Sequence, residues 1–116
     1  MFDLLAINND MLALIKDIKK RYKIKHTIEL FYTDETQNVG ATIHKPAKRR
    51  SKIFIGISHK SLFKHGKEEV FRLLRHELAH AICMARNQNS GHDSNDFKRY
   101  CYELKASPYE FIGRSV

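Results

Sequence analysis

The residues most capable of chemistry lie together in the run His76-Glu77-Leu78-Ala79-His80. Two histidines at positions i and i+4 of a helix lie one above the other on the same face. This spacing lets both imidazoles bind one tetrahedral Zn²⁺ ion at about 2.0–2.1 Å. Glu77 lies roughly 100° further round the helix, where its carboxylate can approach a zinc-bound water without binding the metal. The run therefore predicts a hydrolytic zinc site with Glu77 as the general base.

The sequence around this run predicts the helix that carries it, from Lys67 to Arg86. Apolar residues recur along one stripe of this helix, which we expect to face the core: Val70, Phe71, Leu74, Leu78, Ala81, Ile82 and Ala85. The two histidines and Glu77 fall in a second sector, which has an apolar border. A histidine with only a packing role more often stands alone, so this sector indicates a site.

A catalytic zinc ion usually has three protein ligands and one open position, so a third ligand is needed. The candidates downstream are His92, Asp93, Asp96 and Glu103. The five residues from Asn87 to His92 can span up to about 16–18 Å, and Gly91 permits a reversal of the chain. Glu103 matches the helix-borne glutamate of other zinc proteases, but it lies about 110° from the apolar stripe of its own helix. We therefore favour His92, with Glu103 as the alternative.

The rest of the sequence predicts an α+β fold with one small sheet packed against helices. Apolar residues recur at helical spacing from residue 3 to 22, and again from 94 to 104, where Phe97, Tyr100, Cys101 and Leu104 form the stripe. Three strands are expected, over 27–32, 39–44 and 52–57. Residues 33–38 form a turn, 58–66 a loop or short helix, and the tail after Pro108 either docks on the core or frays.

The chain has 116 residues, of which 42% are hydrophobic and 29% charged, as in an ordinary globular protein. This length suits a single domain over residues 1–116. The N-terminus lacks the basic start of a signal peptide, and no apolar run approaches the ~20 residues of a membrane span. Cys83 and Cys101 form no CxxC pair, which excludes a zinc ribbon. Two cysteines without a secretory signal suggest reduced thiols. We therefore expect a cytoplasmic monomer without a membrane partner.

The net charge of +8 favours polyanionic partners. The densest positive run lies between the second and third expected strands and comprises Lys45, Lys48, Arg49, Arg50 and Lys52. This run either binds DNA phosphates without sequence preference or is a solvated turn. It contains no aromatic residue, which argues against a platform on which bases stack.

The run from Glu69 to Ala81 (EVFRLLRHELAHA) is followed by Gly91-His92 and then by Phe97-Lys98. With these motifs the chain resembles the SprT-like (Spartan-type) metallopeptidase domains, over roughly residues 38–105. These domains have a HExxH helix, a third zinc histidine in a Gly-His element and a Phe-Lys pair in the following helix. The resemblance implies a zincin-like minimal domain that binds one zinc ion through His76, His80 and His92. It also implies a protease that acts near DNA, on proteins crosslinked to it.

Two other classes of function remain open at this point. In the first, the chain is a basic nucleic-acid-binding module whose zinc is structural, but structural zinc favours four protein ligands and needs no carboxylate at Glu77. In the second, the chain is a metal-dependent nuclease, but such sites usually rely on carboxylates, and few lie near the histidines. The leading hypothesis is a zinc-dependent endopeptidase.

Overall fold

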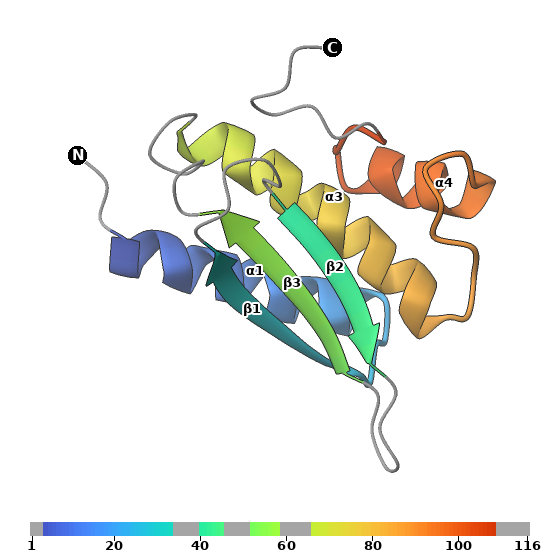
Figure 1. Cartoon of the computed structure of the whole chain (residues 1–116), viewed down its shortest axis with the longest axis horizontal. Coiled ribbons are helices and arrows are strands. Elements are labelled where there is room, and N and C mark those ends of the chain that lie inside the picture. Colours follow the sequence, from blue (N-terminus) through green and yellow to red (C-terminus); the bar gives the residue numbers. More distant parts are fainter. Residues whose placement is uncertain (1–3, 34–39, 46–51, 59–65, 109–116) are drawn as a thin grey trace.

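The computed structural model describes residues 4–33, 40–45, 52–58 and 66–108 (Figure 1). Its elements follow the order α1 (Leu4–Arg21), β1 (Thr27–Thr33), β2 (Gly40–Lys45), β3 (Lys52–Ser58), α3 (Lys67–Ala85) and α4 (Asn95–Glu103). The predicted α+β class is confirmed, and the ends of these elements differ from the predicted ones by one residue at most. The expected turn at 33–38 is described only at Thr33, which instead ends β1. The rest of that turn, most of the 58–66 segment and the tail from residue 109 lie outside the described residues.

The sheet has the strand order β1-β3-β2, with β1 parallel and β2 antiparallel to β3. In this register Lys52 of β3 lies between Thr27 of β1 and Lys45 of β2. The central strand alternates fully buried isoleucines with other residues. Gly56 is one of these other residues, and a Cβ atom there would lie 2.6 Å from the ring of Phe31 on the neighbouring strand. The parallel pairing of β1 with β3 was not predicted.

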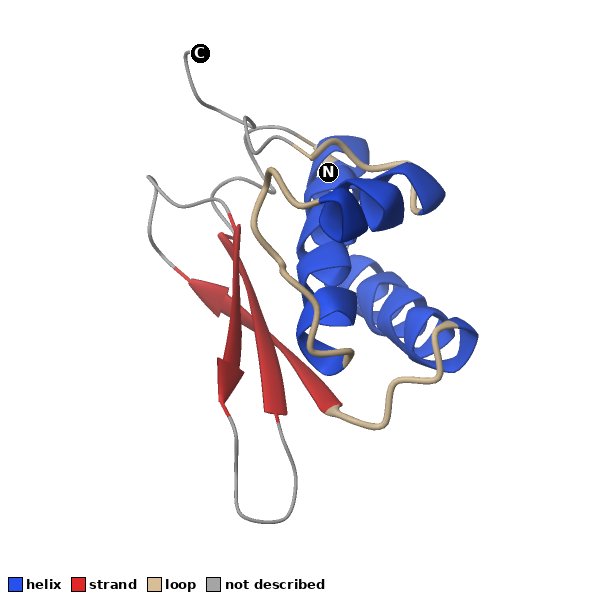
Figure 2. Cartoon of the chain, turned by 90° about the vertical axis from the view of Figure 1, so that its right-hand side faces the viewer, coloured by secondary structure: helices blue, strands red, loops and turns tan. Residues whose placement is uncertain are grey.

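All three helices of the described chain lie on one side of the sheet (Figure 2). The core between the helices and the sheet is built from the apolar stripes of the helices and from β3; its members include Met11, Ile15, Ile18, Ile53, Ile55, Ile57, Val70, Leu74, Leu78 and Ile82. On α3 the predicted core stripe is correct, with Phe71 and Ala85 at its half-buried margin. α4 packs on a different side of α3, where it buries the second sector as well.

No helix in the described ranges is long and apolar enough to cross a membrane.

Each of the three helices ends in the same backbone motif, in which the chain reverses through a residue with positive φ. These residues are Lys23 after α1, Asn87 after α3 and Lys105 after α4, with φ of 55°, 55° and 57°. In each case the next amide donates to a carbonyl five residues back, as in Gln88 N–H to Cys83 O at 2.8 Å. This is the Schellman arrangement, in which glycine is normally preferred because it lacks a Cβ atom.

Lys23→Gly should therefore raise the free energy of unfolding by up to about 1 kcal/mol, because glycine relieves the left-handed strain of an exposed side chain. Lys20→Gly, at an exposed position inside α1, is the matched control and should lower it by about 1 kcal/mol. Urea denaturation of both variants measures the difference. Equal destabilisation by the two glycines would contradict the assignment of Lys23 as a strained helix terminus.

Candidate metal centre

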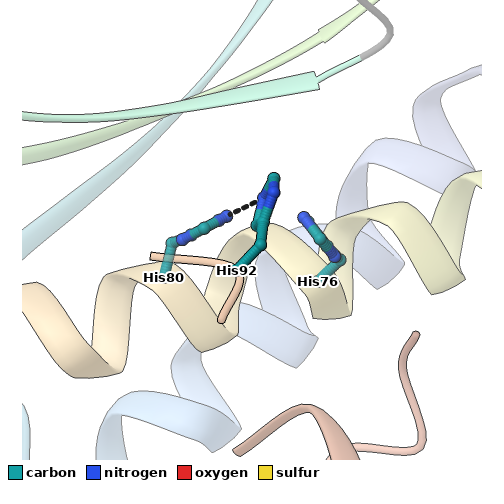
Figure 3. Close-up of side chains that lie close together, drawn as sticks. All are labelled: His76, His80 and His92. Atoms are coloured by element: carbon teal, nitrogen blue, oxygen red, sulfur yellow. Dashed lines mark hydrogen bonds between the residues drawn. The ribbon is translucent and has the colours of Figure 1, made fainter. Parts of the chain in front are cut away.

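The structure brings three histidines together beside α3 (Figure 3). His76 and His80 come from consecutive turns of α3, and His92 comes from the segment between α3 and α4. One ring nitrogen from each lies within 4.8 Å of those of the other two. His76 is buried, His80 is half-buried and His92 is exposed, so the cluster runs from the protein interior to the surface.

The donor set fits a divalent metal ion such as zinc. Ligands at 2.0–2.1 Å around a tetrahedral ion lie about 3.3–3.4 Å from one another. The Nε2 atoms of His80 and His92 are 3.2 Å apart, close to this separation. Imidazole is also a ligand that suits zinc, copper, iron and nickel, whereas calcium and magnesium prefer oxygen ligands. The centre is therefore suited to a transition metal or zinc.

His76 is held by a contact that sequence reasoning missed. Its Nδ1 atom lies 2.7 Å from the backbone carbonyl oxygen of Ser107, in the segment after α4. A carbonyl oxygen can only accept, so Nδ1 must carry the proton and Nε2 keeps the lone pair that a metal needs. Such a partner on the second nitrogen is the usual way in which a protein orients a metal-binding histidine. No side-chain pattern could indicate it, because the acceptor is a main-chain atom.

Glu77 is 1% exposed, and it follows His76 directly on α3. A buried carboxylate is costly unless it is partnered, so its retention beside three histidines is typical of a functional site. The thiol of Cys101 on α4 is near enough to respond to this carboxylate. The pKa of Cys101 rises to about 12, mainly because the thiol is buried, with further increases from Cys83 and Glu77.

Neither cysteine belongs to the histidine cluster, and neither is suited to act as a nucleophile. Burial is also the main reason why the pKa of Cys83 rises to about 11. Both thiols therefore stay protonated at neutral pH, and the thiolate is the nucleophilic form. Both cysteines are free, as expected for reduced thiols.

The alternative third ligand, Glu103, does not join the histidines. Its carboxylate accepts a hydrogen bond from the hydroxyl of Tyr22 at 2.6 Å, and this contact ties α4 to the end of α1. The pKa of Tyr22 rises to about 12, first because of burial and then because of Glu103. Asp96 lies 3.5 Å from Arg99 on its own helix, and Asp93 is exposed. Of the four candidates, only His92 reaches the cluster formed by the described residues.

The basic run between β2 and β3 is only partly described. Lys48, Arg49 and Arg50 lie outside the described residues, and of Lys45 only the backbone is described. Lys52 lies at the start of β3, where its ammonium is 3.7 Å from the carboxylate of Glu29 on β1. The expected role of this run in DNA binding therefore stays a prediction.

The fold and the site define a class: an α+β domain whose long helix presents two histidines and a glutamate in a HExxH motif, completed by a histidine from the following segment. The chain belongs to the SprT-like family, whose model matches residues 10–113. The expected family is thus confirmed, and the match extends further than the resemblance did, since it includes most of α1. Neither a curated protein nor a solved structure matches the chain.

The purified protein should bind about one zinc ion per chain, and His92→Ala should lower zinc occupancy far more than Glu103→Ala. Of these two residues, His92 supplies a ring nitrogen to the cluster, whereas the carboxylate of Glu103 accepts a hydrogen bond from Tyr22 at the end of α1. Metal analysis after dialysis against a weak chelator measures the difference. The opposite ranking would reassign the third ligand to Glu103.

Proposed function

We propose that this protein is a zinc-dependent endopeptidase in which His76, His80 and His92 hold the metal and Glu77 is the general base. The observation that carries the proposal is the convergence of the three histidine nitrogens next to a buried glutamate on the same helix. Membership of the SprT-like family supports it.

The proposed roles follow from the position of each residue. A bound zinc ion would supply Lewis acidity, which lowers the pKa of a water molecule toward ~7 and polarises a carbonyl group. Glu77 takes the proton of the attacking water and later delivers it to the leaving amine. The carbonyl of Ser107 keeps the proton of His76 on Nδ1 throughout, so this ring holds its orientation during the reaction.

The composition of the cluster favours catalysis over a purely structural zinc. A structural zinc ion usually has four protein ligands, and a catalytic one has three. Within the described part of the chain, the group of possible ligands contains three histidines and no fourth member. The most exposed of them, His92, lies on the solvent side of the cluster, from which a substrate could enter. No carboxylate of the described ranges joins the three histidines as a possible ligand, and this argues against a nuclease.

A polypeptide substrate is supported by the strand that lies beside the centre. β2 is an edge strand that packs next to α3, and in Figure 3 it passes above the histidines. Among the described residues no strand pairs with its outer edge. An extended peptide can add to such an edge through main-chain hydrogen bonds, so its scissile bond could be held near the metal without sequence-specific contacts.

Glu77→Gln should retain zinc and the fold, and it should lose peptidase activity by roughly 10²–10⁴-fold, because the amide cannot accept the proton of water. Digestion of a casein-like protein, followed by gel electrophoresis alongside metal analysis of the same sample, measures both properties. His76→Ala is a useful control, since it should lose metal and activity together. Undiminished cleavage by Glu77→Gln would show that the assignment of the base is wrong.

We also propose that the protein binds DNA without sequence preference, which would bring the peptidase to DNA-bound or DNA-crosslinked proteins. The strand register brings Lys45, Lys52 and the residues just before Thr27 to one end of the sheet. The last turn of α1, which is separated from the start of β1 by only five residues, contains Lys19, Lys20 and Arg21. Basic residues from segments far apart in the sequence thus support a polyanion-binding end.

DNA affinity should fall steeply with salt, with a slope of log K against log salt of about −0.7 to −0.9 per phosphate contact. Replacing Lys48, Arg49 and Arg50 by Glu should flatten this slope by roughly two or three contacts and leave zinc occupancy unchanged. The matched control reverses three exposed lysines on the helical side: Lys16, Lys98 and Lys105. Fluorescence anisotropy at several salt concentrations gives the slope for each variant. The comparison separates the effect of the basic run between β2 and β3 from the effect of a lower net charge. Equal slopes for the two triple variants would contradict a role of the loop.

A further inference from the structure

One aromatic side chain of α4, Phe97, lies against all three histidines. Its ring is stacked on His80, with centroids 4.2 Å apart and planes inclined by 20°. It meets His76 edge to face, at 5.2 Å and 83°. The ring of His92 is 5.5 Å away at 40°. Phe97 thus contacts all three histidine rings, two of which come from α3 and one from the segment between α3 and α4.

Phe97 itself is firmly held. It is 0% exposed, and its backbone amide donates to the Oγ atom of Ser94, which caps α4. One turn further along, the hydroxyl of Tyr100 donates to Gln88 at 2.6 Å and accepts from Arg86 at 3.0 Å. These bonds join α4 to the segment that follows α3. A ring with so little freedom can fix the orientation of the histidines that touch it.

We propose that Phe97 is a positioning residue that sets the metal affinity of the centre through its stack on His80. An imidazole that binds a cation loses electron density, and the negative face of a parallel aromatic ring then attracts it more strongly. The bound state therefore gains more from the stack than the free state does. An aliphatic side chain of similar volume would fill the space without this gain. The inference rests on the proposed metal centre and concerns binding of the ion, before any chemistry.

The test compares Phe97→Leu with Ile15→Ala in the full chain. Both reduce a buried apolar side chain, but Ile15 belongs to the core side of α1, a helix that carries none of the three histidines and is not part of the connection that carries His92. Zn²⁺ affinity is measured by competition with a chelating dye. Coordination geometry is followed through the visible absorption of the Co²⁺-loaded protein. Circular dichroism and urea denaturation report the folded fraction.

Phe97→Leu should weaken zinc binding by roughly 10-fold or more and alter the Co²⁺ spectrum, as loss of other partners that orient metal ligands does. Ile15→Ala should lower the urea midpoint at least as much, and it should leave zinc affinity within about twofold and the spectrum unchanged, because α1 carries none of the ligands. Phe97→Met, whose flexible side chain repacks more easily, serves in place of Phe97→Leu if the latter does not fold.

Wild-type affinity and spectrum in Phe97→Leu would overturn this inference and leave the proposed function intact. Equal loss of affinity in Phe97→Leu and Ile15→Ala would also overturn it, because the effect would then reflect the stability of the fold alone. Failure of the wild-type protein to bind zinc would refute the proposed function together with this inference.

Discussion

The site depends on the packing of α4, and of the segment that follows it, against the polar side of α3. An amphipathic helix on a sheet normally leaves its polar side in water. Here that side is covered, and His76 and Glu77 are 2% and 1% exposed. Burial of two such groups is unfavourable unless each finds a partner, and the hydrogen bond from His76 to Ser107 supplies one of these partners. The packing of α4 on α3 therefore also fixes the orientation of the side chains in the site.

The turn after α3 determines where α4 can lie. Asn87 takes up a left-handed conformation, and the amide of Gln88 closes the helix end on Cys83. Gln88 then accepts from the hydroxyl of Tyr100, so the beginning of the connection is bonded to the middle of α4. His92 lies between these two fixed points. Its nitrogen reaches the metal centre because the connection is short and tied at both ends, without a dedicated strand or helix of its own.

Much of this could be predicted from the sequence, since the relevant signals are local. Helical periodicity placed α1, α3 and α4 to within one residue at each end, and the i, i+4 spacing brought His76 and His80 onto one face. The chain from Asn87 to His92 is long enough to return to the metal, and Glu103 lies off the apolar stripe of its helix. These two points were enough to favour His92 over Glu103. Burial of the histidine sector was not predicted, because it depends on α4, whose position relative to α3 has no local signal. The parallel pairing of β1 with β3 and the carbonyl of Ser107 were missed for the same reason: strand partners and main-chain acceptors leave no mark in the side-chain pattern.

The partner of His76 also bears on the reactivity of the centre. A carboxylate at this place would raise the basicity of the imidazole and donate more electron density to the metal. The carbonyl of Ser107 is neutral, so it fixes the tautomer and orientation of the ring with a weaker electronic effect. With three neutral imidazoles as ligands, a divalent ion would keep its full formal charge and remain a strong Lewis acid. The one carboxylate next to the ligands on α3, Glu77, is then left for proton transfer, which separates the two tasks of hydrolysis between the ligand set and its neighbour.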